Sequence, residues 1–292
     1  RLVRISQELD LVAGMTGDGV NDSPALKKAD VGFAMGSGTE VAKEASDIVI
    51  LDDNFSSVGK AVLYGRTIFS SIRKFIVFQL TINITAVAVS FISPLLGMDN
   101  PLTITQILWV NLVMDTLAAL AFGSEPALSR YMREKPRSRR EPIISPYMKT
   151  ELITGAVWIT LLSLLFLITG INTSDGSLKA NGLIGRLFRG YEGYGTEYLL
   201  TGYFDFFILS AVFNAFNART EKLNIFDSIG DNRNFLRVMG AIAAVQVIMT
   251  YWGGKVLGCY GLNLGEWVTV LVMSLSVIPV DMIRKAALSR KK

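Results

Sequence analysis

The sequence predicts a membrane α-helical bundle of six transmembrane helices that is preceded by part of an α/β domain. Half of the 292 residues are hydrophobic and only 18% are charged, which is too apolar for an ordinary soluble domain. Near the N-terminus, short apolar runs alternate with short helical patterns. This alternation is typical of a Rossmann-like parallel sheet whose faces are covered by helices.

Residues 1–57 are expected to form the C-terminal part of a cytoplasmic α/β domain. Three short apolar runs predict strands, and Gly36–Thr39 predicts a turn into a helix over Glu40–Ala45. The predicted strands are Leu11–Ala13, Val31–Ala34 and Ile48–Leu51. Three strands make a poor independent sheet, so we expect the first strands upstream and take the chain, which opens on Arg1, to be a fragment.

A polar, glycine-spaced loop, Thr16–Asp22, lies between the first of these runs and a helix predicted over Ser23–Lys28. Carboxylates at the end of a strand lie where open α/β sheets bind ligands. Gly17 and Gly19 let the backbone approach a bound group closely, and Asp18 and Asp22 suit Mg²⁺. The alternative is a turn whose Asp and Asn side chains bond to their own backbone.

A stalk helix over 58–74, with four basic residues, is expected to lead into the membrane domain, residues 75–292. The spans that follow are each long enough, or nearly so, to cross a bilayer at ~1.5 Å per residue. They are expected at about 75–96, 102–122, 152–171, 199–216, 235–252 and 267–283.

Basic residues gather in alternate loops. Arg130–Arg140 holds six Arg and Lys residues against one acid, Glu134, and the tail from Arg284 to Lys292 is also basic. This pattern predicts an integral membrane protein with both termini in the cytoplasm. The basic run could instead bind a regulator or an anionic lipid, although the sequence identifies no regulatory partner.

Asp115 is the strongest candidate for a site within the membrane. An acid at the core of a span costs at least ~2.5 kcal/mol on insertion, so it indicates function. Asn111 lies one helical turn earlier, and Asn83 in the preceding span could face both across the hairpin. Carboxylate and amide oxygens suit a hard cation such as Ca²⁺, and the alternative is a hydrogen bond between helices.

The remaining polar residues of the spans are expected to be structural or interfacial. They are Glu151, Asp205, Asn214, Asn217 and Asp281, the last neutralised by Arg284 or Lys285. The single cysteine, Cys259, excludes an intrachain disulfide, and the absence of histidine excludes imidazole chemistry. A net charge of +4 is spread over loops between spans, so nucleic-acid binding is not expected.

Two stretches resemble a known family. The first resembles the end of the phosphorylation domain of P-type ATPases, which has a haloacid-dehalogenase-like fold; it reads MTGDGVNDSPALKKADVGFAMGSGTEVAKEASDIVILDDNF. The second resembles the sixth transmembrane helix of the calcium pumps in this family; it reads LWVNLVMDTLAALAFGSEP. The resemblance covers the end of that domain and transmembrane helices five to ten.

The resemblance implies ATP-driven export of a cation through an aspartyl-phosphate intermediate. The family's motif begins at Thr16 and Gly17, and Asp18 matches its Mg²⁺ ligand. Asn21 and Asp22 match residues that contact the phosphoryl group and orient the site. The phosphorylated aspartate, the nucleotide-binding domain that takes ATP and the fourth transmembrane helix with its glutamate are absent. Activity of this piece alone is therefore not expected.

Three departures from the two-site calcium pumps are informative. Ala86 and Ala211 stand where those pumps carry acids, and Met114 stands where they carry threonine. These losses would leave one site around Asn111 and Asp115, as in plasma-membrane-type pumps that move one Ca²⁺ per cycle. The second span also lacks the glycine or proline expected of the family's unwound helix.

The sequence leaves alternatives to a calcium pump of the plasma membrane or a bacterial inner membrane. One is a P-type pump for Na⁺, K⁺ or Mn²⁺, which shares the phosphorylation motif. Another is a truncated, non-catalytic membrane protein.

Overall fold

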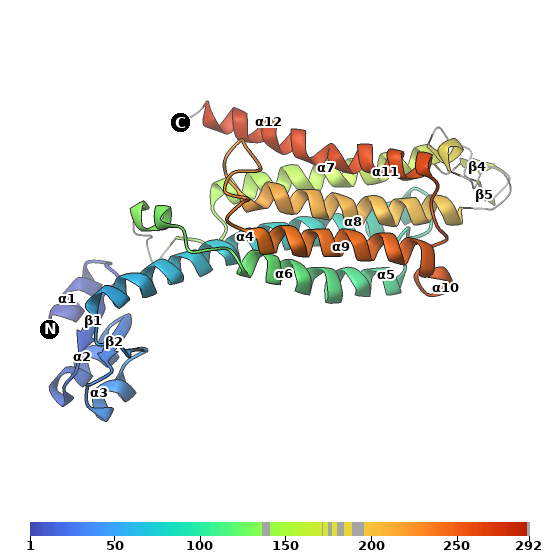
Figure 1. Ribbon diagram of the computed structural model, residues 1–292. Coiled ribbons are helices and arrows are strands. Elements are labelled where there is room, and N and C mark those ends of the chain that lie inside the picture. The colour runs from blue at the N-terminus through green and yellow to red at the C-terminus, as the bar shows by residue number, and fades with distance from the viewer. Residues whose placement is uncertain (136–140, 171, 175–176, 180–183, 189–195, 291–292) are drawn as a thin grey trace. The chain divides into compact units, whose positions relative to one another are not determined.

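The computed structural model describes residues 1–135, 141–170, 172–174, 177–179, 184–188 and 196–290. Arg137, Arg139 and Arg140 of the predicted basic run, and Lys291 and Lys292 of the tail, lie outside the described residues. The chain divides into two compact units (Figure 1). The first takes residues 1–70 and 126–145, and the second takes 71–125 and 146–292.

The first unit contains a three-stranded parallel sheet in the order β1-β2-β3, as the sequence predicts. Its strands are β1 (Gly14–Gly17), β2 (Val31–Met35) and β3 (Ile48–Ile50). The first strand begins at Gly14 and excludes the predicted run Leu11–Ala13, which is therefore a wrong assignment. Asp10 adopts a positive φ of 62°, and the backbone N–H of Ala13 donates to the Asp30 side chain at 2.8 Å, so the chain reaches the sheet only after this turn.

Two short helices pack against this sheet, α2 (Ser23–Lys28) and α3 (Glu40–Ala45). Two further helical segments, α1 (Leu2–Glu8) and η1 (Val20–Asp22), contact α2. Pro24 lies in the first turn of α2, where its missing N–H costs no hydrogen bond. Thr39 caps α3 by accepting from the backbone N–H of Ala42 at 3.3 Å. Leu26, Phe33 and Ala42 are buried between these elements.

The stalk helix and the first span form one continuous helix, α4 (Phe55–Leu95). No proline interrupts it before Pro94, close to its end. In the first unit, Arg66 of α4 donates to the backbone carbonyls of Tyr131 at 2.7 Å and Glu134 at 2.9 Å. Arg66 thereby ties the 3₁₀ segment η3 (Ser129–Arg133) to α4.

The described residues contain six helical segments that are long and apolar enough to cross a membrane, in agreement with the predicted fold class. Besides α4 these are α5–η2–α6 (Ile104–Leu108, Trp109–Met114, Asp115–Gly123), α7 (Pro146–Gly170), α8 (Glu197–Arg219), α9 (Arg233–Trp252) and α11–α12 (Leu264–Leu275, Val277–Ser289). The connections include α10 (Gly254–Leu257), η4 (Gly185–Leu187) and the antiparallel pair β4 (Asn172–Ser174) and β5 (Ser177–Lys179). We conclude that the chain is an integral, multi-pass membrane protein.

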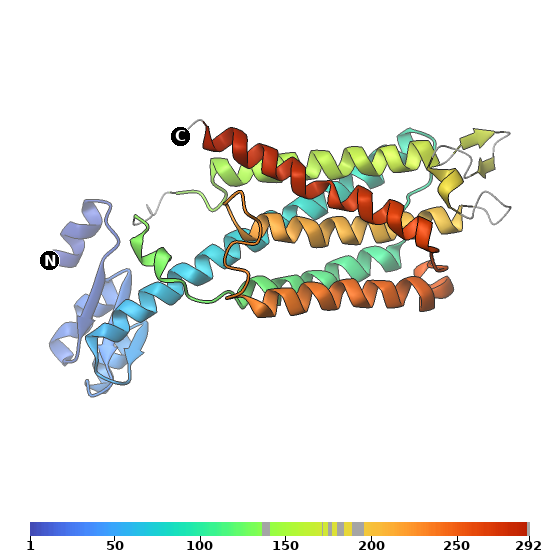
Figure 2. The ribbon, with the colours of Figure 1, turned by 45° about the horizontal axis from the view of Figure 1, so that its top comes forward.

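Helix α8 is the most enclosed of the six. In its most apolar window 83% of the residues are buried, against 28–33% in the other five helices. It packs against α7, α9, α11 and α12, and Figure 2 shows it within the bundle of the second unit. Phe206 of α8 stacks on Phe166 of α7 with ring centroids 5.8 Å apart. Helix α8 therefore buries side chains on most of its circumference, polar ones such as Asp205 included.

A buried ionic cluster joins α7 to α12. Asp281 accepts from the Arg284 guanidinium at 2.6 Å and pairs with the Lys285 ammonium at 2.8 Å, so both predicted partners neutralise it. Arg284 also pairs with Glu151 at 3.5 Å. Lys285 donates to the backbone carbonyl of Asn217 on α8 at 2.9 Å, which adds a third helix. Two acids and two bases thus balance each other within the bundle.

Candidate functional site

The loop Thr16–Asp22 follows the order strand, tight turn, helix that the sequence predicts. Thr16 and Gly17 end β1, residues Val20–Asp22 form a 3₁₀ turn, and α2 begins at Ser23. Asp22 folds its side chain back under the loop, where Oδ2 accepts from the backbone N–H groups of Asp18 at 3.2 Å and Gly19 at 3.1 Å. Asp22 therefore makes the contact expected of the alternative, in which an Asp side chain of the turn bonds to the backbone of the same turn.

Gly17 makes the position of Asp22 possible. A Cβ atom at residue 17 would lie 2.5 Å from the Cβ of Asp22, far inside van der Waals contact. The glycine is therefore needed for close packing of a side chain, in addition to the close approach of a ligand that the sequence predicts.

Asp18 and Asn21 are exposed, and among the described residues the Asp18 carboxylate has no hydrogen-bond partner. The Asp18 backbone, in contrast, is fixed from a second loop. Its carbonyl accepts from the backbone N–H of Thr39 at 2.8 Å, and a Cβ at Gly38 would lie 3.0 Å from the same oxygen. The second loop thus fixes the backbone of Asp18 and leaves its carboxylate open.

Asp53, which was not among the predicted site residues, holds the second loop in place. Its Oδ1 accepts from the backbone N–H of Ser37 at 3.0 Å, and this hydrogen bond lowers the pKa of the Asp53 carboxyl below its ordinary value of 3.8. The signal was present in Asp52-Asp53-Asn54, a run typical of turns that bond to backbone groups.

In the membrane unit, Asp115 is 6% exposed and lies at the start of α6. Its Oδ2 accepts a hydrogen bond from Nε2 of Gln79 on α4. It forms no ion pair with any residue in the described part of the chain. The residue predicted across the hairpin is Asn83, and Gln79, which lies one turn earlier on the same helix, was not among the predicted site residues.

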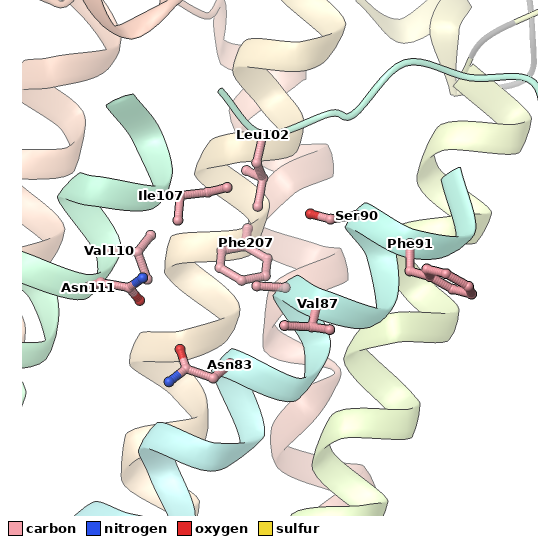
Figure 3. Close-up of a pocket in the computed structure, with 10 residues that line it drawn as sticks. Asn83, Val87, Ser90, Phe91, Leu102, Ile107, Val110, Asn111 and Phe207 are labelled. Atoms are coloured by element: carbon pink, nitrogen blue, oxygen red, sulfur yellow. The ribbon is translucent and has the colours of Figure 1, made fainter. Parts of the chain in front are cut away.

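Asn83 and Asn111 line one cavity of about 530 Å³, and their side chains point into it from α4 and η2 (Figure 3). Ser90 adds a third polar group, and apolar side chains such as Phe207 complete the lining. Asp115 does not line this cavity. The structure therefore brings Asn83 and Asn111 together and places Asp115 against Gln79.

The segment before Asp115 departs from α-helical geometry. Trp109–Met114, which includes Asn111, is π-helical between α5 and α6. The span lacks glycine and proline, yet its helix is irregular next to the candidate residues. Single π-helical turns inside α-helices frequently occur at functional sites.

The other acidic and amide residues predicted in the spans are buried within the bundle. Asn214 and Asn217 are 4% and 1% exposed, and their place at the membrane interface stays a prediction. Asp205 is fully buried, and its Oδ1 accepts from Gln246 and Thr250 of α9, both at 2.7 Å. Within the described ranges no three His, Cys, Asp or Glu side chains form a metal-binding group. A membrane cation site here would therefore need amide or carbonyl oxygens beside Asp115.

Two family models match the chain. Residues 99–287 match the cation transporting ATPase C-terminus, and residues 12–62 match the haloacid dehalogenase-like hydrolase. The second match agrees with the haloacid-dehalogenase-like fold that the resemblance implies for the N-terminal segment.

Similar proteins of known name come from animals and plants. The chain is 40% identical over 267 residues to plasma membrane calcium-transporting ATPase 2 of Oreochromis mossambicus, covering 90% of this chain and 23% of that protein. It is 39% identical over 277 residues to plasma membrane calcium-transporting ATPase 1 of Mus musculus, covering 94% and 22%. It is 40% identical over 289 residues to the putative calcium-transporting ATPase 13, plasma membrane-type, of Arabidopsis thaliana, covering 98% and 26%.

The chain thus spans about a quarter of the length of these relatives. The first model covers well over half of the chain, and the second accounts for its N-terminal α/β segment. The chain belongs to the P-type cation-transporting ATPases and is similar to plasma-membrane calcium-transporting members of that family.

Proposed function

We propose that this chain is part of an ATP-driven pump that exports Ca²⁺ through an aspartyl-phosphate intermediate, one Ca²⁺ per cycle. The observation that carries the proposal is Asp115, a buried carboxylate without an ion pair in the described residues, next to a π-helical break in a membrane helix. A carboxylate within a membrane span is costly to insert and is by default a sign of function. The similar relatives are named as calcium-transporting ATPases, which favours Ca²⁺ as that ion.

The loop Thr16–Asp22 would serve phosphoryl transfer in this pump. Its open carboxylate at Asp18 fits a Mg²⁺ ion that completes its shell with water and phosphate oxygens. The bound ion would neutralise phosphoryl charge, the exposed Asn21 would contact the phosphoryl group, and Asp22 with Gly17 would hold the loop in shape. ATP and the phosphorylated aspartate would come from other segments of the pump.

In the membrane, Asp115, Asn111 and Asn83 would supply oxygens to Ca²⁺ as the transported substrate. Ala86, Met114 and Ala211 offer no oxygen ligands in their side chains, which supports a single site. The alternating basic loops support cytoplasmic termini in a plasma or bacterial inner membrane.

The test is the ATPase activity of the full-length protein in liposomes, titrated separately with Ca²⁺, Mn²⁺, Na⁺ and K⁺. We expect activation by micromolar Ca²⁺ alone. Asp115→Asn should abolish Ca²⁺-dependent phosphorylation from ATP and leave phosphorylation from inorganic phosphate intact, because only the ion site changes. Activation by another ion would keep the phosphorylation chemistry and refute Ca²⁺ as the substrate, and normal Ca²⁺ activation of Asp115→Asn would refute the site.

A further inference from the structure

Two buried oxygen atoms beside the hydrogen bond between Gln79 and Asp115 have no partner among the described residues. They are Oε1 of Gln79 and Oδ1 of Asp115. Each is an acceptor, and each belongs to a residue that uses its other polar atom in the shared hydrogen bond. Buried acceptors without a donor are unfavourable, so this pair of oxygens needs an electropositive group.

The helical hairpin brings these residues together by its register. Gln79 and Asn83 lie four residues apart on α4, and Asn111 and Asp115 lie four residues apart on the following helix. Because the chain reverses direction between the two helices, the earlier residue on α4 meets the later one on its partner. Gln79 therefore contacts Asp115, and Asn83 shares a cavity with Asn111.

The chemistry of the glutamine side chain supplies what a cation would need. Its carboxamide carries an acceptor oxygen and a donor NH₂ of nearly the same size, so a half-turn of the amide exchanges them without changing volume. In the observed orientation Nε2 faces the Asp115 carboxylate. After the half-turn Oε1 faces it, which is stable only with a cation between the two groups. Hard cations such as Ca²⁺ take carboxylate and amide oxygens together.

We propose that Gln79 is a direct ligand of the cation that binds at Asp115. This inference rests on the proposed function and adds a residue from α4 to its site. Nε2 of Gln79 holds the Asp115 carboxylate in place, and on binding Ca²⁺ the amide turns so that Oε1 joins the Asp115 oxygens around the ion.

The experiment uses the full-length protein and measures the Ca²⁺ concentration that half-maximally activates phosphorylation from ATP. Gln79→Met keeps the length of the side chain and removes both polar atoms. It should raise that concentration by about tenfold or more, because loss of a residue that only supports a metal ligand already lowers metal affinity by about tenfold. Gln79→Glu keeps two oxygens and removes the donor, and it should remain within about threefold of the unaltered protein, because a carboxylate is an equally good Ca²⁺ ligand.

Gln246→Met is the matched control. Gln246 is also a buried membrane glutamine bonded to an acid, Asp205, and its loss should leave the Ca²⁺ dependence unchanged. Phosphorylation from inorganic phosphate without Ca²⁺ reports whether each variant is folded. If Gln79→Met is misfolded, Gln79→Leu takes its place, since it also removes both polar atoms and should raise the half-activating Ca²⁺ concentration in the same way.

Unchanged Ca²⁺ dependence in a folded Gln79→Met would overturn the inference. So would a loss in Gln79→Glu as large as in Gln79→Met, because the donor would then be the important atom. A protein that Ca²⁺ does not activate at all would instead refute the proposed function. Ca²⁺ activation that Asp115→Asn abolishes and Gln79→Met leaves intact would refute only the role of Gln79.

Discussion

At the scale of single residues, the two aspartates of the loop Thr16–Asp22 have different surroundings. Asp22 is committed to backbone N–H groups of its own loop, whereas the carboxylate of Asp18 is exposed and open. The glycine at position 17 permits this division because it leaves room for the Asp22 side chain. Geometry at one residue thus leaves the Asp18 carboxylate open and engages Oδ2 of Asp22 with the backbone.

Gly17→Ala should loosen this loop. The added Cβ would meet Asp22 at 2.5 Å, and relieving that contact should cost about 1–3 kcal/mol, as for other overpacked sites. Hydrogen exchange read by mass spectrometry should show faster exchange over residues 14–28. Gly59→Ala in α4 is the control, since its Cβ would meet nothing within 4 Å and alanine favours a helix. Equal exchange in both variants would contradict this account of the loop.

The second loop should depend on pH through Asp53. Its folded-state pKa lies below the ordinary 3.8, so the ionised form stabilises the fold above that value, and this stabilisation is lost as the pH falls through the lowered pKa. Below about pH 4 the Ser37 amide should exchange faster than the pH dependence of exchange itself explains. Asp53→Asn keeps an acceptor oxygen and tolerates the positive φ of 51°, so it should remove this acid sensitivity. Persistence of the effect in that variant would assign it to another group.

Sequence reasoning predicted which residue types form the candidate sites better than it predicted their contacts. Spacing predicted that Asn111 and Asp115 share a helix face, because they lie four residues apart, and the hairpin predicted that Asn83 faces them. It did not show that Gln79 meets Asp115, since the register of two helices depends on the turn between them. It also missed the tie between Asp53 and Ser37, which depends on loop conformation.

At the scale of elements, the ends of helices were harder to predict than their existence. Apolar composition identified all six spans, but the stalk and first span merged into α4 because no breaker separates them. The π-helical segment Trp109–Met114 contains no glycine or proline from which its irregular geometry could be predicted. The first strand was misplaced because Leu11 and Val12, although apolar, are exposed beside a left-handed Asp10.

The cluster that joins α7 and α12 should be essential to the bundle. Asp281→Asn would leave Arg284 and Lys285 facing only one acid of the cluster, Glu151, and breaking a buried ion pair costs about 3–5 kcal/mol. We expect a clear fall in the unfolding temperature in detergent, followed by tryptophan fluorescence, since Trp158 lies on α7. Lys222→Gln removes a largely exposed partner of Asp227 and should change little. Similar shifts in both variants would show that the cluster contributes no more than a surface pair.

At the scale of the whole molecule, six membrane helices and alternating basic loops define a topology that can be measured. The residues to compare are Asp99, in the turn after α4, and Lys222, in the loop after α8, both exposed. If the termini are cytoplasmic, these two loops lie on opposite sides of the membrane. Cys259 adds little background, because it is 1% exposed and burial raises the pKa of its thiol to about 12, so the reactive thiolate is scarce at pH 7.

An impermeant maleimide should therefore label Asp99→Cys in intact cells and label Lys222→Cys only after permeabilisation. The reverse pattern would invert the topology, and labelling of both in intact cells would contradict the number of crossings between them. The control retains Cys259, the one cysteine of these 292 residues, and has serine in place of any cysteine elsewhere in the full-length protein; it should stay unlabelled in both preparations.

The enclosure of α8 also has a consequence for how the protein is made. Translation delivers α8 to the membrane before α9 and α11, two of the helices that cover it. Asp205 must therefore enter the bilayer before Gln246 and Thr250 have been synthesised to receive it. During that interval α8 can already pack against α7, but Asp205 lacks both of the hydrogen-bond donors that α9 supplies in the folded bundle. Burial of a polar group without its donors is unfavourable, so the arrival of α9 is the step that completes the surroundings of this side chain.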